Sequence, residues 1–399
     1  SRHYPRLLLV ITGFHTAMKA KLHREKVARS QRIVVKIGSR VLVQESGKPD
    51  LKRIRSLVKD LVRLRKDGRE VIVVSSGAIG TGMQALGMKT RPTSLPDLQM
   101  AAAVGQCRLM TTYDQIFSAE KCHIGQVLLT HDDLKHRQRH LNARNTMMNL
   151  LRNGIIPIVN ENDVVAVDEI KFGDNDRLAA LVALLIEADL LVLLTTVDGF
   201  RAHSKRVSYL SGVGEKELAQ AIGKSSEIST GGMASKLQAA NLVAQVSAPV
   251  VIANGRTSGI LTKILSGADV GTLIAGDTAA TESVLAGKKR WIAFFNKPQG
   301  VLIVDDGARE AIEKKGTSLL PIGIRDVEGH FPSGSVVNVR TTMGVLFACG
   351  VVDYSSDQIR RIKGLKTSDI AGVLGAKDYD EVIHRDNMVV LGIELGRFA

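Results

Sequence analysis

Short apolar runs alternate with helix-like segments over the first two thirds of the chain. Near-continuous apolar runs of this kind are typical of strands in a parallel sheet whose two faces are both covered by helices. We therefore predict an α/β domain, a three-layer αβα sandwich with a mainly parallel sheet. Its predicted strands are residues 33–37, 71–74, 126–129, 155–159, 190–194 and 250–252.

The pattern changes after residue 287, where strand-like segments are separated by glycine and proline turns and only short helical pieces intervene. This pattern predicts a second, smaller β-rich domain. The segment 267–289, rich in glycine, alanine and threonine, is the predicted connection. The predicted strands of the second domain are residues 301–304, 336–339 and 345–352.

Composition narrows the class of protein. The chain has 399 residues, of which 44% are apolar and 24% are charged, and these values exclude a disordered chain. Its three cysteines lack CxxC spacing, which suits a reducing compartment, so we expect a cytoplasmic protein. No apolar stretch reaches the roughly 20 residues that a membrane span needs, so we expect no membrane partner.

The formal net charge of +14 raises the alternative of an RNA-binding protein. Much of the excess lies in the first thirty residues, where seven Lys and Arg side chains accompany one Glu, so that 7 − 1 = +6. We expect this basic extension, residues 1–30, to lie outside the fold. A start of the native chain at Met18 stays open.

Lys36 lies inside the predicted strand 33–37, and Gly38 follows that strand. A lysine in a strand buried on both faces is costly unless an anion meets it, and a glycine lets a ligand approach the backbone closely. The alternative is a lysine that reaches solvent at the strand end.

The small residues Ser75-Ser76-Gly77-Ala78 follow the strand 71–74 and lead into a predicted helix. At the carboxyl end of a parallel strand, such a turn offers free backbone N–H groups and a helix N-terminus to an anion. The glycine spacing is not the dinucleotide fingerprint GxGxxG. A plain tight turn is the alternative.

Three further segments carry polar chemistry. Residues 160–163 read Asn-Glu-Asn-Asp after a strand, and residues 173–176 read Gly-Asp-Asn-Asp before a helix. Such groups can bind the ammonium of an amino acid, or orient lysines and Mg²⁺. Residues 230–236 read Thr-Gly-Gly-Met-Ala-Ser-Lys and open a predicted helix, which favours a phosphate site. Residues 131–140 mix metal-type ligands with competing cations, so we expect no metal held by protein side chains alone.

In their order and spacing these motifs resemble the amino acid kinase family. The segments Asp305-Asp306-Gly307-Ala308 and Ser318-Leu319-Leu320-Pro321 resemble a PUA domain. The resemblance implies an amino acid kinase catalytic domain over residues 31–287, a PUA-like barrel over residues 288–372 and a C-terminal tail over residues 373–399.

The resemblance also implies ATP-dependent phosphorylation of the γ-carboxylate of L-glutamate, the first step of proline biosynthesis, with Mg²⁺. Lys36 and Lys236 would stabilise the transferring phosphoryl group, and Asp176 would hold the two lysines. Ser76, Asp163 and Asn175 would bind glutamate. Gly38 and Gly77 would donate backbone N–H groups. The remaining expected ATP and phosphate contacts are Thr195, Thr196, Thr230, Gly231, Gly232 and Met233.

The resemblance leaves alternatives open. Another acid could be the acceptor, such as acetylglutamate, aspartate or carbamate, and the PUA-like domain could bind RNA. A homo-oligomer, either dimer or tetramer, and feedback inhibition by proline are implied only by the resemblance. Two departures concern the nucleotide side: Thr196 replaces the aspartate that usually follows Thr195 in the family, and the segment 201–229 is short.

Overall fold

The computed structural model describes residues 4–44, 49–166, 175–222, 232–245, 248–276, 292 and 298–391. The chain divides into two compact units, Ser1–Val284 and Leu285–Ala399. This division lies within three residues of the predicted boundary at 287.

All six strands predicted for the first domain are present, each within two residues of its expected bounds. They are β1 Arg32–Ile37, β2 Glu70–Ser75, β3 Ile124–Leu129, β4 Ile156–Glu161, β5 Leu190–Thr195 and β9 Val250–Asn254. Among these six strands, every neighbouring pair in the sheet is parallel. The predicted fold class, α/β with a mainly parallel sheet, is confirmed.

The complete sheet has eight strands in the order β3-β4-β2-β1-β5-β9-β10-β8. Strand β10 (Thr272–Ile274) is antiparallel to β9, and β8 (Tyr209–Leu210) pairs with β10. A small hairpin of β6 (Arg201–Ala202) and β7 (Lys205–Arg206) lies apart from it. These additional strands were not predicted because runs of two or three residues carry no periodicity.

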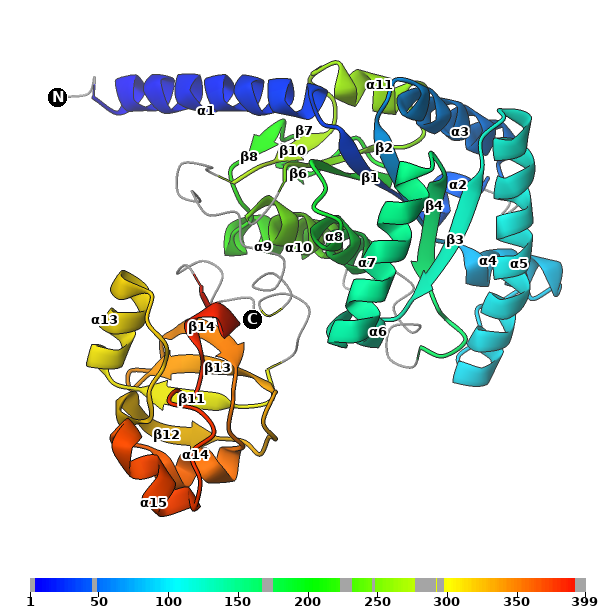
Figure 1. The fold of residues 1–399 in the computed structure, drawn as a ribbon. Coiled ribbons are helices and arrows are strands. Elements are labelled where there is room, and N and C mark those ends of the chain that lie inside the picture. Colours follow the sequence, from blue (N-terminus) through cyan, green and yellow to red (C-terminus); the bar gives the residue numbers. More distant parts are fainter. Residues whose placement is uncertain are drawn as a thin grey trace. The chain divides into compact units, whose positions relative to one another are not determined.

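Helices cover both faces of the sheet, with α3 and α11 on one face and α8 and α10 on the other (Figure 1). Helix α3 begins after Asp50, whose side chain accepts a hydrogen bond from the N–H of Arg53, as its N-cap position predicts. The helices of the first unit after residue 30 are α2 Ser39–Leu42, α3 Leu51–Lys66, α4 Ala78–Ala85, α5 Leu95–Ala119, α6 His131–Lys135, α7 Arg137–Arg152, α8 Asp176–Leu185, α9 Glu215–Ile222, α10 Met233–Ala244 and α11 Ile260–Leu265.

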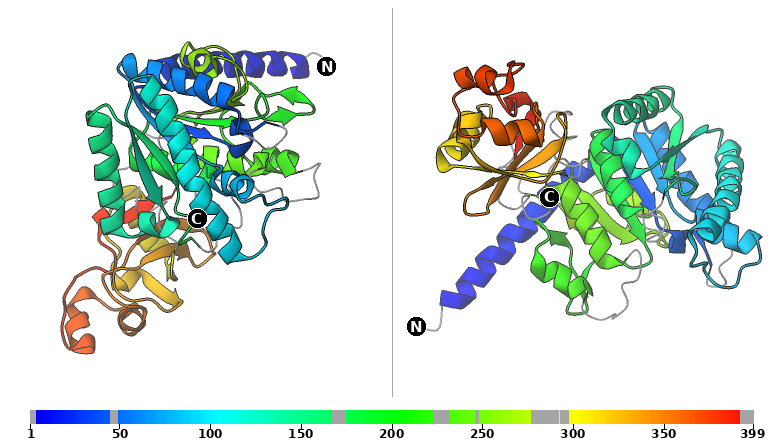
Figure 2. Two further views of the ribbon diagram at one scale, coloured as in Figure 1. Left: turned by 90° about the vertical axis from the view of Figure 1, so that its right-hand side faces the viewer. Right: turned by 90° about the horizontal axis from the view of Figure 1, so that it is seen from below.

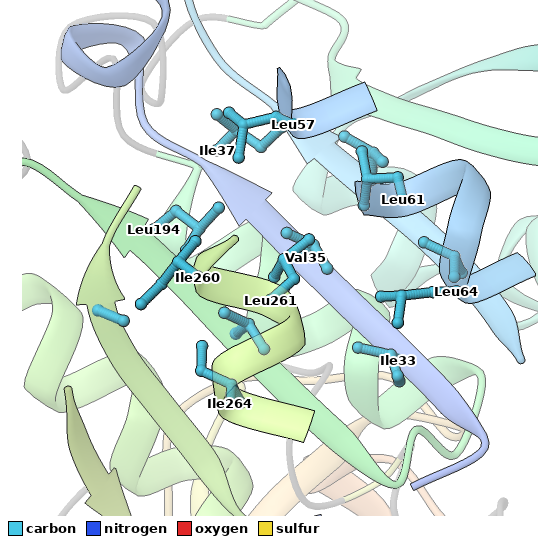
Figure 3. Close-up of a cluster of buried hydrophobic side chains, with 14 of the residues drawn as sticks. Ile33, Val35, Ile37, Leu57, Leu61, Leu64, Leu194, Ile260, Leu261 and Ile264 are labelled. Atoms are coloured by element: carbon cyan, nitrogen blue, oxygen red, sulfur yellow. The ribbon is translucent and has the colours of Figure 1, made fainter. Parts of the chain in front are cut away.

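The alternation of side chains along β1 decides where its lysine points. Ile33, Val35 and Ile37 belong to the hydrophobic cluster that β1 forms with α3 and α11 (Figure 3). Because successive side chains of a strand point to opposite faces, Lys36 points to the face that α8 and α10 cover. The fold therefore places this lysine opposite the apolar cluster.

The end of the basic N-terminal extension packs on the first unit. Helix α1 (Tyr4–Ala28) extends away from the other helices of this unit (Figure 2), but Arg24 and Val27 near its end are only 7% and 2% exposed. The Arg24 guanidinium bonds to the Ala268 carbonyl at 2.8 Å and to Asp269 at 2.7 Å. The expectation that residues 1–30 lie outside the fold is wrong for the end of α1, because Val27 is buried there and the charge of Arg24 has acceptors on the first unit.

The second unit is built on a five-stranded sheet in the order β12-β11-β13-β14-β15. Its strands are β11 Val301–Val304, β12 Ile324–Glu328, β13 Val336–Thr341, β14 Leu346–Val351 and β15 Met388–Val390. Strand β15 pairs antiparallel with β14, so part of the expected tail 373–399 belongs to this domain. The helices are α13 Asp306–Lys315, α14 Ser356–Ile362 and α15 Ile370–Leu374, with short 3₁₀ turns at Pro321–Gly323, Thr367–Asp369 and Arg385–Asn387.

None of the helices in the described part of the chain combines the length and the apolar character that crossing a membrane would require.

Candidate active site

Polar residues gather where the parallel strands of the first sheet end. Strands β1, β2, β4 and β5 are parallel neighbours, so their carboxyl ends share one edge of the sheet. Helix α4 begins just after β2, at Ala78. Lys36, Ser76 and Asn160 lie at or near these strand ends, as the motifs predict.

Three charged side chains meet beside β1. The Lys36 ammonium lies 2.5 Å from one carboxylate oxygen of Asp176, and the Lys236 ammonium lies 2.9 Å from the other. Lys36 comes from β1, Asp176 is the first residue of α8, and Lys236 lies in the first turn of α10. The sequence prediction that Asp176 contacts both lysines agrees with these distances.

This triad is almost completely buried. The exposed fractions are 3% for Lys36, 0% for Asp176 and 5% for Lys236. Removing ions from water is costly unless each ion has a partner, and here one carboxylate serves two ammonium groups. The arrangement holds two cations close together in a desolvated place, which is the electrostatic setting that an anionic group such as a phosphate requires.

Gly38 does not have the predicted role. Its N–H donates to the carbonyl of Leu194 in β5 at 3.1 Å, so strand pairing already uses this donor. A Cβ at Gly38 would lie 3.2 Å from that carbonyl oxygen and 4.0 Å from the Lys36 ammonium nitrogen. The glycine therefore keeps the space beside Lys36 free of a side chain.

The turn after β2 has an unsatisfied hydroxyl group. The Oγ of Ser76 is buried and has no hydrogen-bond partner in the described part of the protein. Gly77, with a φ of 108°, precedes α4, and no side chain caps that helix. Because buried polar atoms normally have partners, an orphaned hydroxyl beside an uncapped helix start indicates a place for a polar ligand.

A network of carboxamides lies behind Ser76. The Asn175 side-chain nitrogen donates to the Ser75 carbonyl and to Asn160 Oδ1, both at 2.6 Å. Asn160 in turn donates to Gln106 Oε1 at 2.7 Å, and the Ser75 hydroxyl lies 2.9 Å from the Tyr113 hydroxyl. The motifs contained Asn160 and Asn175, but sequence reasoning missed Gln106 and Tyr113. They are seven residues apart, a spacing that places both on one face of α5, but the sequence does not show which residues that face contacts.

Asp163 lies in the loop after β4. Burial raises the pKa of its carboxyl to about 6, and the positive charge of Arg91 opposes part of this rise. A carboxylate that is costly to ionise alone is stabilised when a cationic ligand arrives. A carboxyl in this setting can hold an ammonium group, and glutamate binding by Asp163 stays a prediction.

The expected nucleotide contacts are described only in part. Thr195 ends β5 and is half-buried, as is Thr196, and the Thr195 carbonyl accepts from Gly255 N–H at 2.8 Å. Gly232 precedes α10 as an N-cap without a capping side chain, and Met233 is the first residue of that helix. Thr230, Gly231, Gly173 and Asp174 lie outside the described residues.

Two models of known protein families match the chain. Residues 31–254 match the model of the amino acid kinase family, and residues 300–374 match that of the PUA domain. The chain belongs to the amino acid kinase family, which confirms the predicted family and kinase class and implies that it uses ATP.

Three curated relatives carry a more particular name. The chain is 45% identical over 377 residues to the glutamate 5-kinase of Citrifermentans bemidjiense, covering 93% of this chain and 100% of the relative. It is 46% identical to the glutamate 5-kinase of Geobacter sulfurreducens, covering 92% and 99% of the two chains. It is 48% identical to that of Geobacter metallireducens, covering 90% and 98%.

Proposed function

We propose that this protein transfers the γ-phosphoryl group of ATP to the γ-carboxylate of L-glutamate and forms γ-glutamyl phosphate, the first step of proline biosynthesis. The buried triad of Lys36, Asp176 and Lys236 is the observation that carries this proposal. The glutamate 5-kinases similar to this chain support the identity of the acceptor.

The reaction needs no nucleophile from the protein. A γ-carboxylate oxygen attacks the γ-phosphorus of ATP, the bond to the bridging oxygen breaks, and ADP leaves with that oxygen's electron pair. Catalysis then consists of alignment and neutralisation of the charge on the phosphoryl oxygens. Lys36 and Lys236 supply that neutralisation, while Asp176 holds both ammonium groups in place.

Glutamate recognition falls to the neighbouring polar residues. Asp163 pairs with the α-ammonium group, and the Ser76 hydroxyl, which has no partner in the described structure, bonds to a carboxylate oxygen. The Asn175 carboxamide adds an acceptor from the start of α8. The uncapped start of α4 at Gly77 favours negative charge close by.

Mg²⁺ would be bound together with the nucleotide. The described residues contain no group of three or more metal-type side chains, and both carboxylate oxygens of Asp176 already bind lysines. These residues fit an ion held mainly by ATP phosphate oxygens and water, which is how Mg²⁺ is commonly bound. It would neutralise phosphate charge there. Gly232, Met233, Thr195 and Thr196 stay the proposed nucleotide contacts, together with Thr230 and Gly231.

Other expectations stay predictions. A location in the cytoplasm is consistent with the three free cysteines, of which Cys122 and Cys349 are buried. A dimer or tetramer, inhibition by proline and RNA binding by the second unit have no support beyond the family resemblance.

The test is acceptor specificity. Purified protein would be given ATP, Mg²⁺ and glutamate, aspartate or acetylglutamate as the sole acceptor, and ADP release would be followed with hydroxylamine trapping of the acyl phosphate. We expect ADP and hydroxamate in equal amounts with glutamate alone. ADP without hydroxamate, or preference for another acid, would contradict the proposal.

A further inference from the structure

The carboxamide network behind Ser76 joins four elements of the first unit. Gln106 belongs to α5, Asn160 to β4, Asn175 precedes α8, and Ser75 ends β2. Every bond between them is 2.6 or 2.7 Å long. We propose that Gln106 is a positioning residue: through Asn160 it fixes the orientation of the Asn175 carboxamide and thereby the affinity for glutamate. This inference rests on the proposed function.

Only one placement of the amide oxygens and nitrogens fits this network. A backbone carbonyl such as that of Ser75 can only accept, so the nitrogen of the Asn175 side chain must face it. The second hydrogen of that nitrogen goes to Asn160 Oδ1. The Asn160 nitrogen must then face Gln106, which has to present its oxygen. Hydrogen-bond chemistry thus fixes which side-chain atom of each amide is the oxygen and which is the nitrogen.

This placement determines what Asn175 offers to a ligand. Both hydrogens of its amide nitrogen are used by Ser75 and Asn160, so its Oδ1 is the side-chain atom left for recognition. That atom is a pure acceptor and suits the α-ammonium group of glutamate. If Asn160 rotated, one hydrogen of the Asn175 amide would lose its acceptor, and the Ser75 carbonyl alone would hold the carboxamide in the orientation that presents Oδ1.

Close packing holds the backbone of α5 in place next to Gln106. A Cβ on the preceding residue, Gly105, would lie 1.7 Å from the Ala78 carbonyl oxygen, so α5 and the first turn of α4 are in direct backbone contact. Tyr113, two turns further on the same face of α5, contacts the Ser75 hydroxyl at 2.9 Å. Gln106 therefore projects from a backbone that cannot shift to replace a lost bond.

The test compares three replacements in the full-length protein. Gln106→Met keeps the side-chain length but removes the acceptor, and Gln106→Glu retains an acceptor. The matched control is Gln115→Met, the same change at an exposed position of α5. For Gln106→Met we expect the KM for glutamate to rise about tenfold, with the KM for ATP and kcat within about twofold. Gln106→Glu and Gln115→Met should stay within about threefold of the unmodified protein.

Several outcomes would overturn the inference. These are an unchanged glutamate KM in Gln106→Met, equal changes in the KM values of both substrates, or a Gln106→Glu protein as impaired as Gln106→Met. Thermal unfolding of each variant separates a positioning role from a structural one, which would lower Tm and kcat together. If the unmodified protein prefers another acid, the proposed function fails, and the inference is judged by the KM for that acid.

Discussion

The two units differ in the charge of the polar residues that they bury. In the first unit the buried polar residues include the ions Lys36, Asp176 and Lys236. Those of the second unit, within the described residues, are uncharged: Ser335, Asn338, Thr341 and Ser356. The second unit keeps its ion pairs at the surface, for example Arg360 with Asp357, whose side chains are 32% and 78% exposed.

The difference indicates which unit holds charged side chains away from water. Surface ion pairs contribute about 0–1 kcal/mol and are often neutral for the fold, so they need no functional explanation. Buried ions reduce stability unless their partners are well placed, and they are found where chemistry requires charge in a desolvated site. The comparison therefore supports the proposal that phosphoryl transfer takes place in the first unit.

The sharpest way to break this comparison is Asp176→Asn. Asparagine has nearly the same shape but leaves two buried ammonium groups without the carboxylate that they share. We expect a loss of roughly 3–5 kcal/mol in unfolding free energy and at least a thousandfold lower kcat. Asp357→Asn, at the exposed pair, is the matched control and should change stability by at most about 1 kcal/mol. Similar effects of the two replacements in chemical denaturation would contradict this proposal.

Lys236→Met should have a smaller but still large effect, confined to activity. Asp176 retains Lys36 at 2.5 Å, so the buried carboxylate stays paired and the fold persists. Loss of one phosphoryl-stabilising cation should cost about 3 kcal/mol in the barrier, roughly a hundredfold in kcat. Steady-state kinetics and circular dichroism on the same preparation provide the check. A folded variant with near-normal kcat would remove Lys236 from the mechanism.

Asp163→Asn should weaken the binding of glutamate and leave the binding of ATP unaffected. The ammonium loses its ionic partner, so the KM for glutamate should rise about tenfold or more while the KM for ATP changes less than about twofold. Burial raises the pKa of Asp163 to about 6, so the folded protein binds this proton more tightly than the unfolded chain does. The ionised carboxylate therefore lowers the stability of the fold as the pH rises through about 6. The replacement should therefore not lower Tm at pH 7.5.

The same pKa predicts a pH dependence. As the pH falls through about 6, Asp163 gains a proton and loses the charge that attracts the ammonium, so the KM for glutamate should rise. In Asp163→Asn that rise should be absent between pH 5.5 and about 7.5. Parallel KM profiles for the two proteins would show that another group is responsible.

The fold was largely predictable because its strands are long apolar runs. The strands that sequence reasoning missed lack this signal: β12 includes Arg325, Asp326 and Glu328, and β6, β7, β8, β10 and β15 have only two or three residues each. The packing of α1 was missed because Arg24 looks like a surface residue until the carbonyl of Ala268 and the carboxylate of Asp269 are seen beside it.

The site was predictable where a motif lies at a strand end or helix start, as for Lys36, Asp176 and Lys236. Two features depend on tertiary structure instead. The Gly38 N–H donates to the carbonyl of Leu194 in the neighbouring strand. The local sequence does not show which strands are neighbours, so this bond could not be predicted. Gln106 acts from the middle of a helix, where an isolated glutamine resembles any half-exposed residue until Asn160 is placed beside it.

Removal of the second unit should have the smallest effect. Every proposed catalytic residue lies between Lys36 and Lys236, and the first sheet is complete with β10, which ends at Ile274. The second unit has its own hydrophobic core, which includes Leu302, Val337 and Ile359, as a separable domain requires. A chain of residues 18–287 retains Arg24 and Val27, which pack on the first unit, and we expect its kcat with glutamate to stay within about threefold of the full chain. Circular dichroism must first show that the shortened chain is folded. A folded but inactive chain would mean that the second unit contributes to the active site and that the division between the two units is wrong.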